Sequence, residues 1–346
     1  MPMTVGTGIG TDMSAAPQRA RELEEQGYDY LAIGETSRNP FLPLVLVAEH
    51  TEHIRFGTSV AIAFPRVPHI TANIAWDLSH YSGGRFVLGL GTQVKGHNER
   101  RFSVPWAPPG PRLRDYINCV RAIWDSWQNG TKPNYEGEYY QYKLTSPFFN
   151  PGPIEHPDIK IVISAVNPFN ARLAGEVCDG IAIHGFSTFE YIREVLLPAV
   201  HEGARRAGKD PKDLMISGGG FIVTGRTEEE VARAKEASRR QISFYASTRS
   251  YSRVMKQHGW DDEAAQLHRL SIEGGWDEMV DVITDDMMEE FCVIGTWDEL
   301  VGNMREKYAG INTQVGFSAT PRNPDEAEQI KEIIAELKTI PAVGEA

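Results

Sequence analysis

The sequence predicts a (β/α)8 barrel, the fold in which eight parallel strands alternate with eight helices. Short and almost continuously apolar runs, typical of buried parallel strands, alternate along the chain with amphipathic helical stretches. Eight such pairs fit into the 346 residues. No Gly-x-Gly-x-x-Gly turn follows the first strand, so an open dinucleotide-binding sheet is disfavoured.

The first half of the chain contains four regular strand–helix pairs. The predicted strands are residues 3–8, 28–34, 54–61 and 86–91. The predicted helices are residues 15–26, 43–52, 70–79 and 113–128. Before the fourth helix a polar excursion covers residues 92–111, and after it residues 135–149 read as a small hairpin. We therefore expect an insertion after strand four.

The second half repeats the pattern more loosely. The predicted strands are residues 160–164, 180–184, 214–223 and 313–317, and their helices are residues 167–177, 188–207, 227–245 and 323–338. Residues 247–290 form an irregular helical insertion after strand seven, a possible lid, followed by the apolar run 291–295 and a helix at 297–308. No linker rich in Pro, Gly or Ser divides the chain, so residues 1–346 are expected to form a single domain.

Composition and charge exclude several classes of function. The net charge of −12 disfavours a nucleic-acid partner and adhesion to an anionic membrane. No signal sequence or membrane-spanning run is visible. The three cysteines Cys119, Cys178 and Cys292 match neither a disulfide framework nor a zinc motif. A cytoplasmic protein is expected.

The active site of such a barrel lies at the carboxyl ends of its strands. The segments there contain glycines, small apolar residues, amides and hydroxyls, with too few His and carboxylate residues for a metal hydrolase and no nucleophile elbow. We therefore expect no metal in the active site. A lining of this kind suits a flat aromatic cofactor that is held by hydrogen bonds and that itself supplies the chemistry.

Several segments resemble the luciferase-like superfamily of flavin and deazaflavin oxidoreductases. They are residues 54–60 (IRFGTSV), 77–79 (DLS), 82–92 (SGGRFVLGLGT) and 170–180 (NARLAGEVCDG). Residues 245–248, 258–260 and 291–295 resemble its actinobacterial-type branch of F420-dependent oxidoreductases. The resemblance covers essentially the whole chain. It implies deazaflavin F420 as hydride carrier, with FMN as the alternative cofactor.

The resemblance also implies which residues contact the cofactor. Relatives have a non-prolyl cis peptide at the end of strand three, which Ser59-Val60 matches best and Val60-Ala61 less well. At the position where sugar-phosphate dehydrogenases of this superfamily have an Asp-His pair, this chain has Glu35-Thr36, which disfavours a sugar phosphate as substrate. In place of the phosphate-binding glycines of relatives it has Val166-Asn167. The expected cofactor-binding residues are Gly34, Thr36, Ser59, Val60, Ala61, Thr92, Gln93, Asn98, Ala165, Val166, Asn167, His184, Gly185 and Phe186.

Two residues are candidates for a catalytic role. Glu35, at the mouth of an apolar barrel, could serve as a general acid or as a cofactor ligand. His97, in the loop after strand four, could donate a hydrogen bond to the reacting groups or lie at the surface. The expected lining of a hydrophobic substrate pocket is aromatic and consists of Phe64, Trp106, Tyr245, Tyr251 and Trp260.

Three functions fit these expectations. The first is an F420-dependent oxidoreductase that exchanges a hydride with a small-molecule substrate, namely an activated C=C bond, a ketone or an alcohol. The second is an FMN-dependent monooxygenase, and the third is a non-catalytic carrier of flavin or deazaflavin. The resemblance further implies an F420 reductase or dehydrogenase as hydride source, and a homodimer whose interface would suit Ile74 and Trp76.

Overall fold

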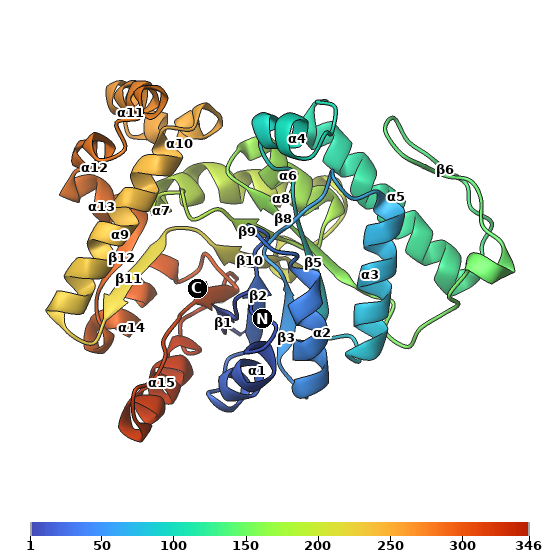
Figure 1. Ribbon diagram of the computed structural model, residues 1–346, viewed down its shortest axis with the longest axis horizontal. Helices are drawn as coiled ribbons and strands as arrows, with labels where there is room; N and C mark the ends of the chain where they lie inside the picture. The colour runs from blue at the N-terminus through green and yellow to red at the C-terminus, as the bar shows by residue number, and fades with distance from the viewer. Residues whose placement is uncertain (1, 345–346) are drawn as a thin grey trace. The chain divides into compact units, whose positions relative to one another are not determined.

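The computed structural model describes residues 2–344 of the chain, which form two compact units (Figure 1). The N-terminal unit comprises Gly6–Ser164 and Leu173–Ile181. The C-terminal unit comprises Ala182 onward, Ala165–Arg172 and the first described residues as far as Val5. Each unit is described by itself below.

The strand order confirms the (β/α)8 barrel. The main sheet runs in the order β3-β2-β1-β13-β10-β9-β8-β5-β4, and β3 also pairs with β5, so the order closes on itself. Its members are β1 (Thr4–Gly8), β2 (Tyr30–Ile33), β3 (Arg55–Thr58), β4 (Ala61–Ile62), β5 (Phe86–Gly91), β8 (Lys160–Ala165), β9 (Gly180–Ile183), β10 (Met215–Gly218) and β13 (Gln314–Gly316). The pairings of β1 with β2, β2 with β3, β3 with β5, β5 with β8 and β10 with β13 are all parallel.

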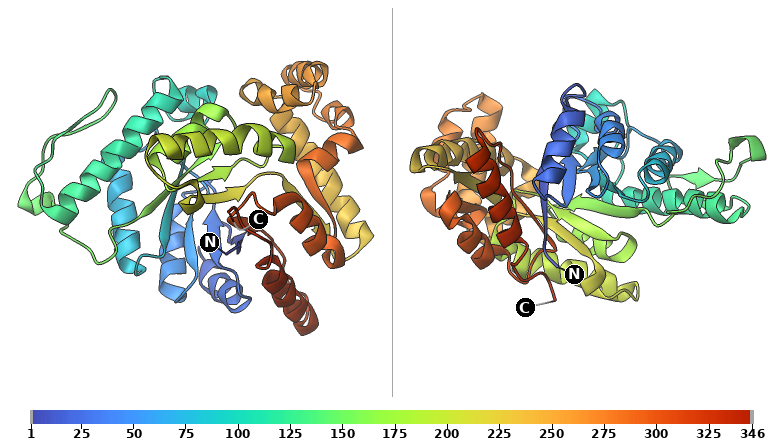
Figure 2. Two further views of the ribbon diagram at one scale, coloured as in Figure 1. Left: turned by 180° about the vertical axis from the view of Figure 1, so that it is seen from behind. Right: turned by 90° about the horizontal axis from the view of Figure 1, so that it is seen from below.

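The N-terminal unit contains the first half of the barrel and its helices. These are α1 (Ala16–Glu25), α2 (Phe41–His50), α3 (Pro68–Tyr81), α4 (Lys95–Arg101) and α5 (Pro109–Asn129). The expected hairpin is present as β6 (Tyr135–Glu136) and β7 (Gln141–Tyr142), followed by the 3-10 turn η1 (Pro147–Phe149), and it extends away from α5 (Figures 1 and 2). The excursion predicted as a polar loop contains the short helix α4.

The C-terminal unit contains the remaining helices. After α6 (Pro168–Val177), which both units share, come α7 (Phe189–Tyr191), the π-helical turn η2 (Ile192–Leu196), α8 (Leu197–Arg206) and η3 (Pro211–Asp213). The region predicted as a helical insertion holds η4 (Arg249–Tyr251), α10 (Ser252–Gln257), α11 (Asp261–Glu273), α12 (Glu278–Val282) and α13 (Asp285–Phe291). The other elements are β11 (Phe221–Gly225), α9 (Glu228–Ala246), β12 (Cys292–Thr296), α14 (Trp297–Tyr308) and α15 (Pro324–Leu337).

The prediction of one continuous seventh strand over residues 214–223 is wrong. Gly218, Gly219 and Gly220 have φ angles of 77°, 81° and 68°, a left-handed conformation that ends β10. The chain resumes as β11, which pairs with β12 in a separate parallel sheet. The third strand, predicted over residues 54–61, is likewise two strands, because Ser59 and Val60 lie between β3 and β4 and interrupt the pairing.

Two strands of the barrel approach unusually closely at Gly89. A Cβ atom on this residue would lie 1.8 Å from the carbonyl oxygen of Thr58. The Thr58 hydroxyl also bonds Gly89 twice, since it donates to the Gly89 carbonyl (2.6 Å) and accepts from the Gly89 N–H (2.9 Å). Only glycine fits at this point of contact between β3 and β5.

The turn after α2 is held from both sides by charged side chains. The carboxylate of Glu24 accepts hydrogen bonds from the backbone N–H groups of residues 52, 53 and 54 at 2.7–3.1 Å. Burial opposes this charge, but the three N–H groups outweigh it and lower the pKa of Glu24. The guanidinium of Arg85 donates to the carbonyls of Ala48, Thr51, Ile54 and Ser82. The turn is thus fixed through its backbone.

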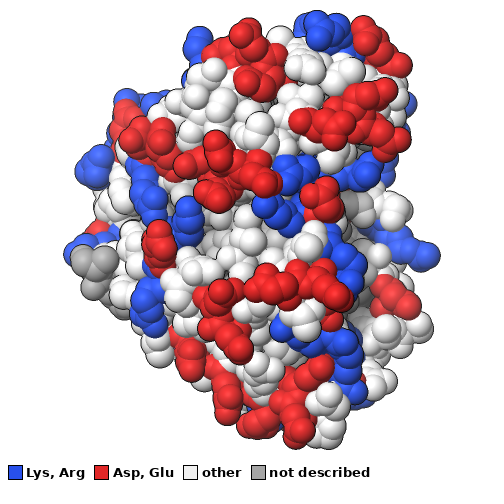
Figure 3. Space-filling view, turned by 90° about the vertical axis from the view of Figure 1, so that its left-hand side faces the viewer, with Lys and Arg blue, Asp and Glu red and all other residues white. Residues whose placement is uncertain are grey.

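Surface features bear on the expected partners. Trp76 is 1% exposed, and its indole N–H donates to the Gly152 carbonyl, so the expectation that Trp76 joins a dimer interface is wrong. Figure 3 shows one face of the molecule, on which acidic side chains cover much of the surface and basic side chains lie among them. Within the described residues, no helix combines the length and apolar character needed to cross a membrane.

Candidate functional site

Glu35 lies in the segment after β2 and is paired with Arg66. The two carboxylate oxygens accept hydrogen bonds from the two Nη atoms at 2.8 and 2.9 Å, and the side chains are only 11% and 17% exposed. The Ile62 N–H donates to Glu35 Oε2 at 2.7 Å, and Arg66 also donates to the Ile62 carbonyl. Such a pair neutralises the carboxylate and fixes the backbone of β4 to the end of β2.

The peptide bond between Ser59 and Val60 is cis, as the resemblance implied. The Glu35 N–H donates to the Val60 carbonyl, so this bulge is bound to the same segment as the ion pair. Gly34 and Ser59 are exposed at this strand end, and Ala61 is buried. A Cβ atom on Gly34 would lie 3.2 Å from the Ser59 carbonyl oxygen, and one on Gly91 would lie 2.7 Å from a Val60 methyl. The glycines therefore allow β2 and β5 to pack closely against the segment of Ser59 and Val60.

The segment after β5 is folded around Asn98. The buried Asn98 amide donates to the Thr92 carbonyl at 3.0 Å, while its oxygen has no hydrogen-bond partner. Gln93 has a positive φ of 54°, a backbone conformation that is uncommon for non-glycine residues. His97, predicted as catalytic, is exposed on α4, whose Arg101 donates to the Thr36 carbonyl. Asn98 thus shapes this loop, and His97 lies at its surface.

Two of the residues predicted for the substrate pocket lie in the N-terminal unit. Phe64 is buried, and the guanidinium of Arg112 lies 4.6 Å from the centre of its ring. Trp106 is 38% exposed. The structure does not place these two side chains in a common aromatic cluster.

In the C-terminal unit, Asn167 caps α6. Its Oδ1 accepts a hydrogen bond from the Asn170 N–H at 3.0 Å, while Ala165 and Val166 are buried. A helix N-terminus favours anions through its free N–H groups. The side chain of Asn167 accepts from one of those N–H groups, that of Asn170, so this group is not free to bind an anion. A glycine at position 167 would leave it free.

His184 follows β9 and is held in a neutral state. Its Nδ1 lies 3.0 Å from the Phe186 N–H, which can only donate, so Nδ1 is the acceptor and the ring proton is on Nε2. Burial lowers the pKa of His184 to about 4. At neutral pH the imidazole is therefore a fixed hydrogen-bond donor with no charge.

An aromatic cluster surrounds His184. Tyr245 and Tyr251 lie 4.7 and 5.1 Å from its ring centre, and Phe186 stacks on Tyr251 and on Phe291. Trp260 joins the cluster through Phe291 at 6.1 Å. The structure thus unites predicted residues of the cofactor site, His184 and Phe186, with three predicted for the substrate pocket. Gly185 lies between the first two, and a Cβ atom there would touch the Phe221 ring at 3.4 Å.

The pKa of His184 makes a prediction for stability. Because its pKa is lower in the folded chain than in the unfolded one, the unfolded state binds the proton more readily. The contribution of neutral His184 to the free energy of unfolding is fully present above the ordinary histidine pKa, and it is lost as the pH falls toward 4. The free energy of unfolding should fall by roughly 3 kcal/mol more between pH 7 and 4 in the wild type than in His184→Gln. Urea unfolding at several pH values measures this, with the exposed His53→Gln as control. An identical pH dependence in the wild type and His184→Gln would contradict it.

Three residues that shape these sites were not identified from the sequence. Arg66 pairs with Glu35, and a basic residue after strand three together with an acidic residue after strand two is a signal for such a pair. Phe291 begins the predicted apolar run 291–295, which gives no sign of its ring contacts. Arg112 lies in a helix where nothing local marks it.

Comparison with known proteins gives the family. Residues 2–314 match the family described as luciferase-like monooxygenase. An uncharacterised protein of Mycobacterium tuberculosis is 42% identical over 307 residues, which are 89% of this chain and 90% of that protein. The chain belongs to the luciferase-like monooxygenase family.

Further relatives and solved structures extend the comparison. The 5,10-methylenetetrahydromethanopterin reductase of Archaeoglobus fulgidus is 28% identical over 91% of this chain and 93% of its own length. The coenzyme F420-dependent tetrahydromethanopterin reductase of Methanopyrus kandleri has a TM-score of 0.77 at 22% identity, covering 97% of this chain and 99% of that one. A type II Baeyer–Villiger monooxygenase of Pseudomonas putida in complex with FMN has a TM-score of 0.65 at 16% identity, covering 99% and 100%. These two structures show a shared fold.

Proposed function

We propose that this protein is an F420-dependent oxidoreductase, which transfers a hydride between deazaflavin F420 and an organic substrate. The observation that carries the proposal is the state of the ionisable groups at the strand ends. Glu35 is neutralised by Arg66, and His184 is held uncharged. Neither is arranged as a nucleophile. The chain therefore offers shape and hydrogen bonds, and a bound cofactor would supply the redox chemistry.

The residues present fit a flat tricyclic cofactor. Gly34 and Ser59 are exposed at the strand end, and the absence of a side chain at Gly34 suits the close approach of a ring. Thr92 and Gln93 offer backbone and side-chain hydrogen-bonding groups. When bound, F420 carries two electrons and a proton as hydride. The chain's own residues would position it and exclude water.

The substrate would be an uncharged or weakly polar small molecule. The rings of Tyr245 and Tyr251 lie beside His184, whose Nε2–H is a donor in a fixed position. A neutral donor of this kind suits a carbonyl or hydroxyl oxygen better than a phosphate. This supports a ketone, an alcohol or an activated C=C bond as the reacting group.

Cofactor binding tests the proposal. Purified apo-protein is titrated separately with F420 and with FMN while cofactor fluorescence is followed. We expect saturable quenching with F420 at a Kd at least tenfold below that for FMN. Tight FMN binding without F420 binding would support the monooxygenase instead. If F420 binds but no acceptor from a panel of ketones and enones oxidises its reduced form in stopped-flow measurements, the chain is a carrier.

A further inference from the structure

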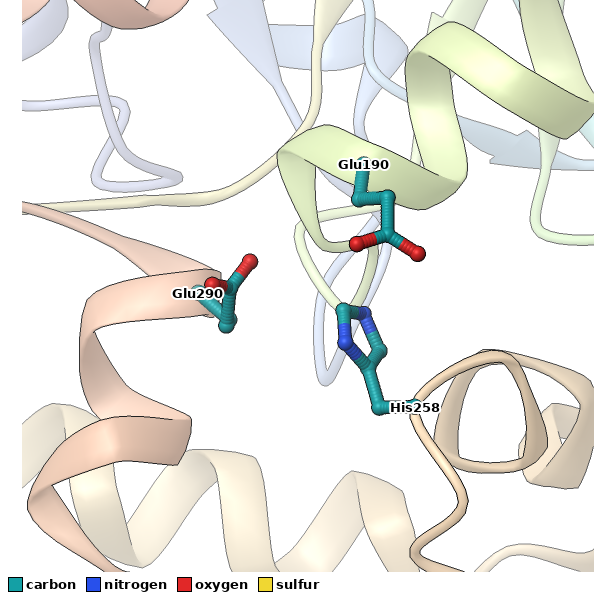
Figure 4. Close-up of side chains that lie close together, drawn as sticks. All are labelled: Glu190, His258 and Glu290. Carbon is teal, nitrogen blue, oxygen red and sulfur yellow. The ribbon is translucent and has the colours of Figure 1, made fainter.

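A cluster of two carboxylates and one imidazole lies in the C-terminal unit, apart from the strand-end residues described above. Glu190 belongs to α7, His258 follows α10, and Glu290 belongs to α13. One ligand atom from each lies within 4.8 Å of the other two. Figure 4 shows the three side chains directed toward a common space.

The imidazole of His258 is oriented by two contacts outside the cluster. Its ring stacks on Trp260 with 4.3 Å between ring centres and 15° between planes. Its Nε2 lies 2.8 Å from the hydroxyl of Thr188, which also accepts a hydrogen bond from the Tyr191 N–H. When Nε2–H donates to this hydroxyl, Nδ1 keeps its lone pair. Metal-binding histidines commonly use their second nitrogen in this way.

The charges of the cluster are not balanced by basic side chains. Within the described residues, neither Glu190 nor Glu290 forms an ion pair with Lys or Arg. Glu190 receives only a neutral hydrogen bond from the Gln257 amide at 3.2 Å. Two half-buried carboxylates this close repel each other, and a cation between them removes that repulsion.

We propose that Glu190, His258 and Glu290 bind a divalent transition-metal ion of the zinc type. Zinc takes nitrogen and carboxylate oxygen ligands at about 2.0–2.2 Å. An ion centred among three atoms at most 4.8 Å apart lies no more than about 2.8 Å from each. Small rotations of half-exposed side chains close that gap. Water would complete the coordination.

The bound ion would join three segments that are far apart in the sequence. It would connect the end of α10 to α7 and α13, and thereby fix part of the region expected to form a lid. Because His258 stacks on Trp260, it would also fix one aromatic residue of the predicted substrate pocket. The sequence-based expectation of no metal applies to the active site at the strand ends, and this cluster lies outside those residues.

Metal titration of the untagged, full-length protein tests the proposal. After dialysis against a chelator, Zn²⁺ is added in a calorimeter, and Co²⁺ is added while visible absorption is recorded. We expect one equivalent of Zn²⁺ to bind, the melting temperature to rise, and Co²⁺ to show the intense bands of a four- or five-coordinate site.

Matched variants localise the site. Glu290→Gln and His258→Asn should each weaken Zn²⁺ binding at least tenfold, whereas Glu289→Gln, at the exposed neighbouring position, should bind like the wild type. Circular dichroism of the metal-free variants establishes whether they are folded. If His258→Asn is unfolded, the result for Glu290→Gln alone decides the test. Absence of stoichiometric Zn²⁺ binding, or wild-type affinity in Glu290→Gln, would overturn the proposal. F420 binding plays no part in this test, so the metal-site proposal can fail while the proposed function holds, and the reverse.

Discussion

Replacing Gly89 with alanine is expected to destabilise the protein by more than about 4 kcal/mol, which is a large part of the stability of an ordinary domain. The added methyl group would lie 1.8 Å from the backbone oxygen of Thr58, a contact that no rotamer can relieve. Relief requires β3 and β5 to separate. That separation would break the hydrogen bonds between Thr58 and Gly89 and disrupt the packing of two buried strands.

The matched control is Gly302→Ala in α14. Apart from the adjoining backbone of α14, no atom lies within 4 Å of the Cβ position there, and alanine favours a helix over glycine by about 0.5–1 kcal/mol. Soluble yield and urea unfolding of the two variants measure the difference. Gly89→Ala within about 1 kcal/mol of the wild type would show that the barrel tolerates a wider spacing here.

Breaking the pair of Glu35 and Arg66 is expected to have the largest effect on activity. Both side chains are mostly buried, and removal of one partner from such a pair costs about 3–5 kcal/mol locally, because the other charge stays behind. The carboxylate also holds the Ile62 N–H, so Glu35→Gln and Arg66→Met should both displace the strand end that would carry the cofactor. We expect each to lower kcat/KM at least a hundredfold.

The pH profile separates anchoring from proton transfer by Glu35. If the pair is an anchor, Glu35→Gln and Arg66→Met lose similar activity, and the double variant loses little more, because the interaction is already absent. The remaining activity keeps the wild-type pH dependence. Loss of one limb of the pH profile in Glu35→Gln alone would instead identify Glu35 as the general acid predicted from the sequence.

Much of the fold could be predicted because its signals are local. The apolar run of β5 and the helix α14 were predicted with the bounds that the structure shows. The α14 boundary is marked by a capping box of Thr296 and Glu299, which local sequence specifies. The breaks within predicted strands three and seven have no comparable local signal, because an apolar strand pattern continues through both. Only the three glycines at 218–220 indicated the second.

The candidate site was harder to predict because its partners lie far apart in the sequence. Glu35 and Arg66 are separated by 31 residues, and His184 lies about sixty residues before the tyrosines that surround it. The residue types of Glu35 and His184 indicated that each could take part in a functional site. It did not indicate that Glu35 would be neutralised or that His184 would be uncharged, because both follow from neighbours that only the fold brings together.

The turn held by Glu24 and Arg85 has a consequence for sequence variation. Apart from the bond of Arg85 to the Thr51 hydroxyl, both side chains contact backbone groups of residues 48–54, and the side chains of Glu52 and His53 are exposed to solvent. Glu52 and His53 can therefore be exchanged freely, whereas the length of the turn cannot change, because an insertion or deletion would move the N–H and carbonyl groups out of reach. Among members of the family, positions 52 and 53 should vary in residue type, and the segment should remain constant in length.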